Sequence, residues 1–453
     1  MLEMVKKNKE ILVICLLYCV IILVFFSLVF DVDDIHLSDD YYEIANNLLS
    51  SAFFSIDNVN ADYTRTPGYP FFLVVIYFLG GNNITVVVIQ VLLLVINVFL
   101  FYRILVMLNT PKRLTLFGTI LSLCYFHVLV CSMNIMAEIL FGFLLMLSMY
   151  FFVKYIKKGK NPWIFLAFSL TLNYALLVRP ILMYFNMLVC AAFLIAFFIK
   201  KVQFKCFALF TLCFLVIFGG WSFRNYLHSG VFVFSTISQN NMYGNYAVIV
   251  TTRIENTGID YIDGRSPSAI DYHEEMFLRE YPEVNDGNLN AAQIAVLQGK
   301  YGSRFLMENF PEYMKANVSG FLKQMLYTGF EGERTQKIAS RPIMRYIMEG
   351  LRFLSLLYII LVYLLYLVGF GIGFKNRDIV QICVFLLCGY LAVPGAIFGD
   401  PRFRDPFFHL LLLCAVSNSG IIIRWLSQKS RVPVFKSLEN YLLNETGTGG
   451  NAL

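Results

Sequence analysis

Long apolar runs alternate with short basic links along most of the chain. A helix needs roughly 20 apolar residues to cross about 30 Å of hydrocarbon, and about ten segments approach that length. The first has no small-residue cleavage site, so we expect an uncleaved anchor. The predicted spans are Ile11 to Phe30, Ile84 to Met107, Leu114 to Cys131, Ala137 to Tyr155, Pro162 to Val178, Ile181 to Ile199, Phe204 to Phe223, Leu351 to Phe374, Ile379 to Phe398 and Pro406 to Trp425. The pattern predicts an all-α polytopic membrane protein.

Lys and Arg concentrate in alternate connections between these spans, which predicts that both termini are cytoplasmic. The basic connections are Lys6 to Lys9, Lys112-Arg113, Lys154 to Lys160, Lys200 to Lys205, Lys375 with Arg377, and Arg424 to Lys436. Two long polar segments, 31–69 and 225–350, are then external. We therefore expect an N-terminal membrane module (1–224), an external loop (225–350), C-terminal membrane helices (351–430) and a cytoplasmic tail (431–453).

Three further stretches predict helices outside the spans. The apolar run Tyr69 to Leu79 is about half the length of a span, so we expect a re-entrant or juxtamembrane helix. In the second external segment, Ile270 to Tyr281 and Asn290 to Met325 mix apolar and charged residues at helical spacing, and Pro311 breaks the latter. These stretches predict amphipathic helices at the membrane surface.

Composition excludes a water-soluble globular protein, because 58% of the residues are hydrophobic and only 15% are charged. The formal charge of +6 does not indicate a nucleic-acid partner, because the basic residues sit in short runs between apolar stretches. No Walker-type loop or paired-histidine spacing occurs, so we expect no nucleotide chemistry, no metal site and no cofactor. The acidic first loop could bind a divalent cation through oxygen ligands, although no EF-hand spacing is present.

The first external segment has the most lopsided charge in the chain. Asp39-Asp40 precedes a helical pattern, SDDYYEIANNLL, in which Ser38 or Asp39 is the expected N-cap. A carboxylate at that helix start, just above the bilayer, is well placed to be a general base. The alternative is a solvated acidic loop. The acidic residues of the segment are Asp31, Asp33, Asp34, Asp39, Asp40, Glu43, Asp57 and Asp62, set against Arg65.

Several external charges lie at helix ends, where the positive-inside bias should deplete Arg. In RTPGYP, two prolines fix φ and Gly68 permits a tight turn, so Arg65 could grip a phosphate with its forked donors. The alternative is an arginine that snorkels from a helix end. Together these charges predict a cavity for an anionic, membrane-resident ligand. The substrate-binding candidates are Arg65, Tyr69, Glu138, Arg179, Arg224, Arg402 and Arg404.

The arrangement resembles the GT-C superfamily of polyprenyl-phosphate-sugar-dependent glycosyltransferases, especially relatives of protein O-mannosyltransferases and aminoarabinose transferases. The resemblance rests on the order of short motifs: SDDYYEIANNLL, RTPGYPFFLVVIY, MAEILFGFLL, LVRP, WSFRNYLHSGVFVFST, FLMENFPEYMKAN and RFRDP. It implies a GT-C-like fold, with an Asp of the first external loop as catalytic base and basic residues around the lipid phosphate. Carried over by position, the base is Asp39, with Asp40 or the earlier Asp33 and Asp34 as alternatives.

The resemblance implies a glycosyltransferase that moves a sugar from a polyprenyl-phosphate donor to an acceptor hydroxyl, with inversion. The acceptor would be a glycan, a lipid or a protein, and the enzyme would lie in the bacterial plasma (inner) membrane with its site on the periplasmic face. An exposed Asp is a weak base, so partial burial that raised its pKa would help it. A surface-polysaccharide polymerase or ligase, or a transporter of lipid-linked saccharides, is the alternative.

Overall fold

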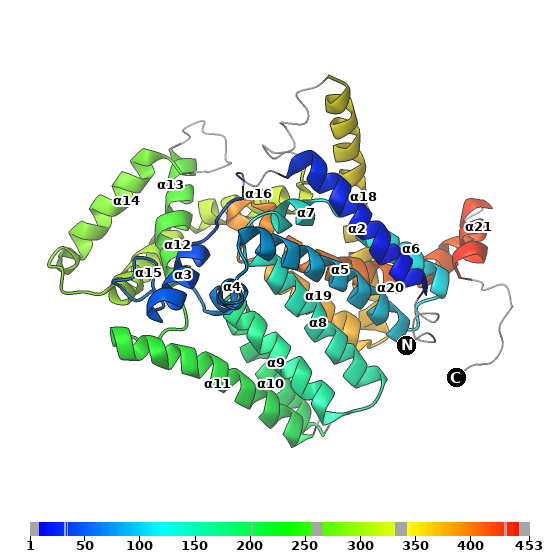
Figure 1. The fold of residues 1–453 in the computed structure, drawn as a ribbon, viewed down its shortest axis with the longest axis horizontal. Coiled ribbons are helices and arrows are strands. Elements are labelled where there is room, and N and C mark those ends of the chain that lie inside the picture. The colour runs from blue at the N-terminus through cyan, green and yellow to red at the C-terminus, as the bar shows by residue number, and fades with distance from the viewer. Residues whose placement is uncertain are drawn as a thin grey trace.

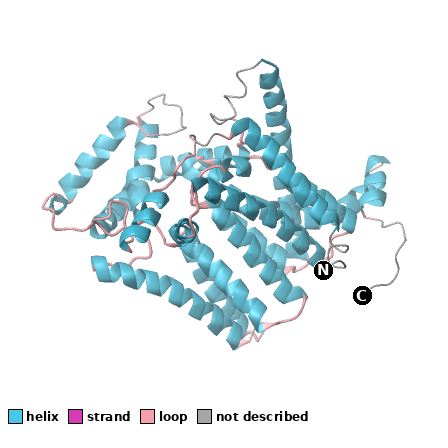
Figure 2. Cartoon of the chain, in the orientation of Figure 1, coloured by secondary structure: helices cyan, strands magenta, loops and turns pink. Residues whose placement is uncertain are grey.

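The computed structural model describes residues 9–30, 33, 35–200, 203–255, 265–330, 342–429 and 433–443. Within these ranges the chain is built from helices and loops, and no β-sheet forms (Figure 2). The predicted all-α architecture is confirmed.

Six helices are long and apolar enough to cross a membrane. They are α2 (Lys9–Val29), α5 (Asn83–Met107), α8 (Glu138–Lys157), α11 (Phe204–Ser229), α18 (Pro342–Lys375) and α20 (Asp405–Lys429). Shorter apolar helices accompany them: α4 (Gly68–Phe78), α9 (Pro162–Val178), α10 (Leu182–Phe198) and α19 (Ile379–Ala392). The protein is therefore an integral, multi-pass membrane protein.

The predicted span Leu114 to Cys131 is wrong as a continuous helix. It divides into α6 (Lys112–Ser122) and the short α7 (His127–Ser132). The break allows the ring of Tyr125 to stack on Phe408 in α20, with ring centroids 3.8 Å apart. Tertiary contact with α20 thus overrides an uninterrupted apolar pattern.

The predicted span Ile379 to Phe398 is also too long, because α19 ends at Ala392. The helix stops ahead of Pro394, because proline has no backbone N–H to donate and its ring clashes with the preceding turn of a helix. The chain continues through η3 (Ala396–Phe398) and η4 (Pro401–Phe403) before α20 begins. These tight turns carry Arg402 and Arg404 across the end of the bundle.

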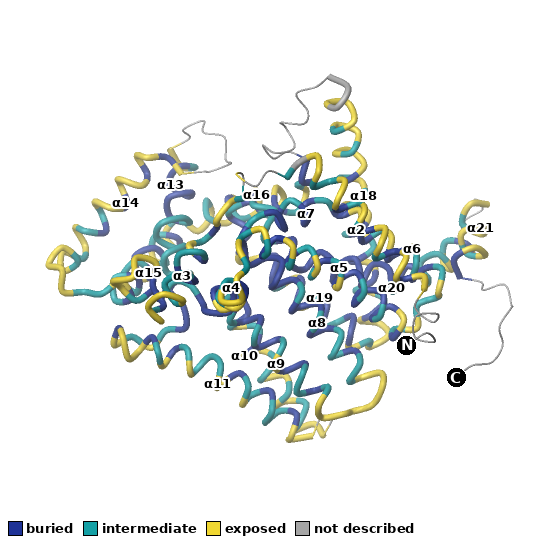
Figure 3. The backbone as a smooth tube through the Cα atoms, viewed as in Figure 1, coloured by how far each residue is buried: buried dark blue, intermediate teal, exposed yellow. Residues whose placement is uncertain are grey.

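The bundle is organised around α8 and α20, which lie in the interior (Figure 3). About two thirds of the apolar stretch of α20 is buried, whereas only about a fifth of the apolar stretch is buried in each of α2, α11 and α18. These outer helices expose large apolar side chains such as Leu23 and Val216. An apolar surface of this kind is stable against lipid tails rather than water.

The external segments fold into short helices at one end of the bundle (Figure 1). They include α3 (Tyr41–Ser51), α12 (Ile237–Asn241), η1 (Met242–Ala247), α13 (Val248–Ile254), α14 (Pro267–Glu280), η2 (Pro282–Val284), α15 (Ala291–Glu308) and α16 (Phe310–Leu326). The predicted amphipathic helices are confirmed in α14, α15 and α16, with the expected break before Pro311. The start of α2 and the C-terminal α21 (Pro433–Leu442) lie toward the opposite end (Figure 1).

Candidate functional site

The loop before α3 is held against the segment that leads into α8. Leu37 and Ile135 form an isolated parallel bridge. The backbone N–H of Ser38 donates to the carbonyl of Ile135 at 3.1 Å, and the N–H of Ile135 donates to the carbonyl of His36 at 2.9 Å. These bonds fix the acidic loop beside the first turn of α8, although the two are far apart in sequence.

Asp39 and Asp40 follow this bridge with left-handed backbones, at φ of 64° and 57°. Aspartate tolerates that region better than most residues. The expected N-cap at Ser38 or Asp39 is wrong: Asp40 occupies the N-cap position of α3 and makes no side-chain capping bond. The double left-handed turn leaves both carboxylates free to interact with cationic side chains.

Arg65 is positioned by the turn that precedes α4. The buried carboxylate of Asp62 accepts the backbone N–H of Arg65 at 2.7 Å and that of Thr64 at 3.3 Å. Burial raises the pKa of Asp62, although these hydrogen bonds oppose the shift. Gly68 does not serve the tight turn expected for it, since its φ is not positive. It lets α4 approach α9, because a Cβ there would lie 2.5 Å from the backbone of Leu177 and Val178.

Asp39 lies between two guanidinium groups from opposite ends of the sequence. Its Oδ1 is 3.4 Å from Nη2 of Arg65, and its Oδ2 is 3.8 Å from Nη1 of Arg402. Asp40 contacts Arg65 at 3.6 Å, but its side chain is 51% exposed, compared with 19% for Asp39. Asp39 is therefore the more enclosed carboxylate of the acidic pair.

Glu138 and Arg179 extend this cluster toward the bundle core. Glu138 opens α8, Arg179 caps the C-terminal end of α9, and the two form a close ion pair. The ring of Tyr69 packs edge-on against Tyr41 with centroids 4.9 Å apart. The guanidinium of Arg65 lies 5.8 Å from the centre of the Tyr41 ring. Two tyrosines thus form an apolar wall beside the charged groups.

Burial by itself would raise the pKa of Asp39, but the guanidinium groups of Arg402, Arg65 and Arg179 outweigh it and lower that pKa. The raised pKa that would help Asp39 as a base is therefore not produced by burial alone. Burial by itself would lower the pKa of Arg402, but the carboxylates of Glu138, Asp400 and Asp39 raise it.

The cluster brings three largely enclosed arginines together. The side chains of Arg65, Arg179 and Arg402 are at most 29% exposed. Asp39, Glu138 and Asp62 are the carboxylates enclosed with them, and the more exposed Asp40 and Asp400 pair with Arg65 and Arg402. The Nε atoms of Arg65 and Arg179 are buried without a hydrogen-bond partner in the part of the chain that the structure describes. Unpaired guanidinium donors are suited to bind an oxyanion such as phosphate.

Arg224 and Arg404 lie outside this cluster. Arg224 donates to the carbonyls of Asp62 at 2.9 Å and Phe54 at 3.2 Å, so it supports the turn beneath Arg65. Arg404 is fully buried and donates to the hydroxyl of Tyr125 at 3.0 Å and the carbonyl of Tyr327 at 2.6 Å. The candidate Asp34 lies outside the described residues.

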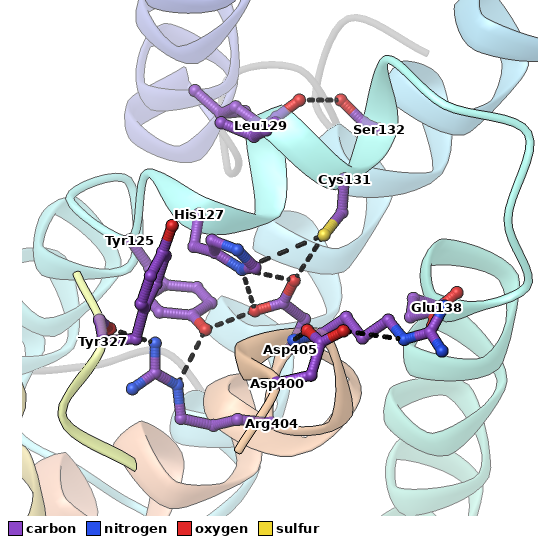
Figure 4. Close-up of polar contacts among 12 residues, drawn as sticks. Tyr125, His127, Leu129, Cys131, Ser132, Glu138, Tyr327, Asp400, Arg404 and Asp405 are labelled. Carbon is purple, nitrogen blue, oxygen red and sulfur yellow. Dashed lines mark hydrogen bonds and ion pairs between the residues drawn. The ribbon is translucent and has the colours of Figure 1, made fainter. Parts of the chain in front are cut away.

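A second polar cluster, formed by His127, Cys131 and Asp405, was not predicted from the sequence (Figure 4). All three side chains are buried, and one ligand atom of each lies within 4.8 Å of the others. These residues could hold a metal ion, so the expected absence of a metal site is not confirmed. The spacing of His127 and Cys131, four apart on a helix, was the available signal, but nothing in the sequence joins them to Asp405.

A cavity of about 280 Å³ adjoins the turn that holds Arg65. Its polar lining comes from Asp62 and Thr64 on one side and from Thr236, Asn240 and Gln298 on the other. It thus lies between the first external segment and the helices of the second.

No protein-family model and no curated protein matches the sequence. Among solved structures, the chain is similar to the archaeal oligosaccharyltransferase AglB from Archaeoglobus fulgidus, which was solved with an inhibitory peptide and a dolichol-phosphate. That similarity covers 98% of this chain and 53% of AglB, with 12% identity and a TM-score of 0.49. This chain therefore spans about half the length of AglB.

The chain is also similar to ArnT from Cupriavidus metallidurans, which was solved bound to undecaprenyl phosphate. The similarity covers 91% of this chain and 80% of ArnT, with 13% identity and a TM-score of 0.37. Scores this low give no residue-by-residue correspondence, so the chemistry of this chain has to be argued from its own side chains.

Proposed function

We propose that this protein is a GT-C-type glycosyltransferase that uses a polyprenyl-phosphate-linked sugar at the external face of the membrane. The observation that carries the proposal is the enclosure of Asp39 between Arg65 and Arg402, above a bundle of apolar helices. A transferase of this kind needs a carboxylate base next to cationic groups that bind a phosphate, and both must be within reach of a lipid.

In the proposed reaction, Asp39 removes the proton from the acceptor hydroxyl as that oxygen attacks the anomeric carbon. The bond between this carbon and the phosphate oxygen breaks, and the lipid phosphate leaves with the electron pair. The single displacement inverts the anomeric centre. Arg65 and Arg402 stabilise the phosphate charge in a site from which water is largely excluded, where such stabilisation is strongest.

The lowered pKa of Asp39 suggests how the donor prepares the base. Without a ligand, the guanidinium groups of Arg402 and Arg65 favour the ionised carboxylate and weaken it as a base. A donor phosphate that binds to these guanidinium groups shares their charge. The pKa of Asp39 then rises toward the range in which it accepts a proton efficiently.

The acceptor is a glycan, a lipid or a protein with a free hydroxyl, and the cavity beside Thr64 and Asn240 is our candidate for its approach. We place the enzyme in the bacterial plasma membrane with this site on the periplasmic face. That orientation follows from the basic links of the sequence.

The test is sugar transfer from a synthetic polyprenyl-phosphate sugar, in membranes and in detergent. We expect Asp39→Asn to lower the rate by about 10²- to 10⁴-fold, the usual contribution of a general base, while donor binding is retained. Asp40→Asn should have a smaller effect, because that side chain is half exposed. Asp271→Asn, an exposed change in α14, is the matched control. Normal transfer by the Asp39 variant would exclude this residue as the base.

A further inference from the structure

The carboxylate of Asp405 lies at the centre of the second cluster (Figure 4). Its Oδ2 is 2.8 Å from Sγ of Cys131 and 2.8 Å from Nδ1 of His127. The sulfur and the imidazole nitrogen are 3.8 Å apart. Three different donor types thus converge on one buried point, from α7 and from the first residue of α20.

The geometry does not suit a nucleophilic thiol. In that arrangement an imidazole lies between the thiol and the acid and takes the thiol proton. Here the carboxylate lies between the other two groups, and a neighbouring negative charge disfavours a free thiolate. A shared cation would instead draw all three donors to itself.

We propose that His127, Cys131 and Asp405 form a structural site for a divalent cation of the zinc class, which fastens α7 to the start of α20. A thiolate, an imidazole and a carboxylate together favour Zn²⁺ over Mg²⁺ or Ca²⁺, which prefer oxygen ligands. Tetrahedral zinc with ordinary bond lengths separates such donors by about 3.3–3.6 Å. The donors present reach that spacing with shifts of less than about 1 Å.

Zinc binding would release the thiol proton of Cys131 to solvent. The ion with one thiolate and one carboxylate is then electrically neutral, which favours a buried position. Three protein ligands leave one tetrahedral position for a water molecule.

A second layer of contacts orients the carboxylate. The hydroxyl of Tyr125 bonds to Asp405 and accepts from Nε of Arg404 at 3.0 Å. Arg404 also donates to the backbone carbonyl of Tyr327 at 2.6 Å. Partners of this kind are typical around metal ligands, whose orientation they fix.

The proposed ion would also help to position the cluster around Asp39. Asp405 is three residues after Arg402, which pairs with Asp39, and α7 leads directly to Ile135, which bridges to the acidic loop. A tie between α7 and α20 therefore fixes the separation of Asp39 and Arg402. The site is distinct from the proposed reaction centre and does not depend on it.

The experiment uses the full-length protein, purified in detergent, loaded with Zn²⁺ or Co²⁺ and then freed of unbound metal. We expect about one metal ion per chain for a site of this kind, and with Co²⁺ a thiolate-to-metal charge-transfer band. Cys131→Ser should abolish the band. Cys388→Ser, a change at another buried cysteine, should leave the band intact.

Tyr125→Phe should weaken metal affinity by about 10- to 100-fold, as the loss of a contact that orients a metal ligand does.

Removal of the metal with a chelator tests the proposal on the wild type alone. The chelator should lower the melting temperature of the wild type. It should not change the melting temperature of Cys131→Ser, provided that this variant is monodisperse. The proposal is wrong if monodisperse wild type retains neither metal, or if Cys388→Ser loses the band as Cys131→Ser does. Because metal content is read without substrate, Asp39→Asn should still bind zinc even if the proposed transferase activity is disproved.

Discussion

At the scale of single residues, the surroundings of Asp39 decide its chemistry. Its carboxylate is mostly enclosed, yet its pKa is lowered because Arg402, Arg65 and Arg179 outweigh the effect of burial. A group whose pKa is lower in the folded protein stabilises the fold above its unfolded pKa. That stabilisation is lost as the pH falls through the folded value.

Replacement of Arg402 by glutamine should move the acidic limb of the transfer rate to higher pH. With one guanidinium group fewer, the ionised carboxylate is less stabilised and the pKa of Asp39 rises, so Asp39 takes up its proton at a higher pH. The measurement is the pH profile of kcat/KM. Arg304→Gln removes a half-exposed arginine in α15 and should leave the profile unchanged. An unshifted profile in the Arg402 variant would show that Asp39 is not the titrating base.

The pair of Glu138 and Arg179 should be important for stability, because the Glu138 side chain is fully buried. Removal of one partner from a buried ion pair costs about 3–5 kcal/mol, since the other charge is left uncompensated. We expect Glu138→Gln and Arg179→Gln each to lower the unfolding free energy on this scale. The double variant should recover part of the loss, and a double-mutant cycle measures the coupling. Fully additive effects would contradict the pairing.

At the scale of elements, the site depends on helices that end or begin at its edge. The C-terminal end of α9 supplies Arg179, the first turn of α8 supplies Glu138, and the turn before α4 supplies Arg65. Helix ends meet here because α4 packs closely against the end of α9 at Gly68. The glycine in RTPGYP therefore serves helix packing, a role that the sequence did not reveal.

Gly68→Ala should disturb this contact. The added Cβ would lie 2.5 Å from the backbone of α9, and overpacking of this kind costs about 1–3 kcal/mol. We expect a lower melting temperature in detergent together with weaker donor binding, since Arg65 and Arg179 flank the contact. The control is Gly220→Ala in α11, where a Cβ meets no atom within 4 Å and helix propensity favours alanine. A Gly68 variant as stable as this control would refute the close approach.

At the scale of the whole molecule, the acidic loop and the tight turn before α20 lie at one end of the bundle, although more than 350 residues separate Ser38 and Arg402, whose side chains are 3.4 Å apart. The outer helices α2, α11 and α18 expose apolar side chains to their surroundings. The arrangement places the charged cluster at one end of an apolar bundle, the position that the proposed lipid-linked donor requires.

The topology can be checked by labelling single cysteines in intact cells with a membrane-impermeant maleimide. In a background that retains only the buried Cys131, we expect labelling of Val59→Cys, which is 76% exposed in the first external segment. Lys158→Cys, in the basic link after α8, should be labelled only after the membrane is opened. The opposite pattern would invert the proposed orientation and place Asp39 on the cytoplasmic face.

Local patterns account for most of the helices. The length of the apolar runs predicted the long spans. The helical spacing of apolar residues predicted α14, and the position of Pro311 predicted the break between α15 and α16. These signals could be recognised because they depend on neighbouring residues. The errors occurred at Leu123 to Phe126 and at Ala392, where the chain leaves the helix to meet a distant segment or a proline. Asp39, Arg65 and Arg402 were all proposed from their external position, but their mutual contact was not.

The sequence by itself determined that this is a multi-pass helical membrane protein with an acidic first loop and arginines at the ends of helices. It could do so because a helix that crosses the hydrocarbon core needs a minimum number of consecutive apolar residues, and such a run is visible in the sequence. Only the tertiary structure decided which charges meet: Asp39 with Arg402, Glu138 with Arg179, and His127 and Cys131 with Asp405. Such pairings depend on how helices pack across the bundle, and no local pattern records the distance between residues that are far apart in the chain.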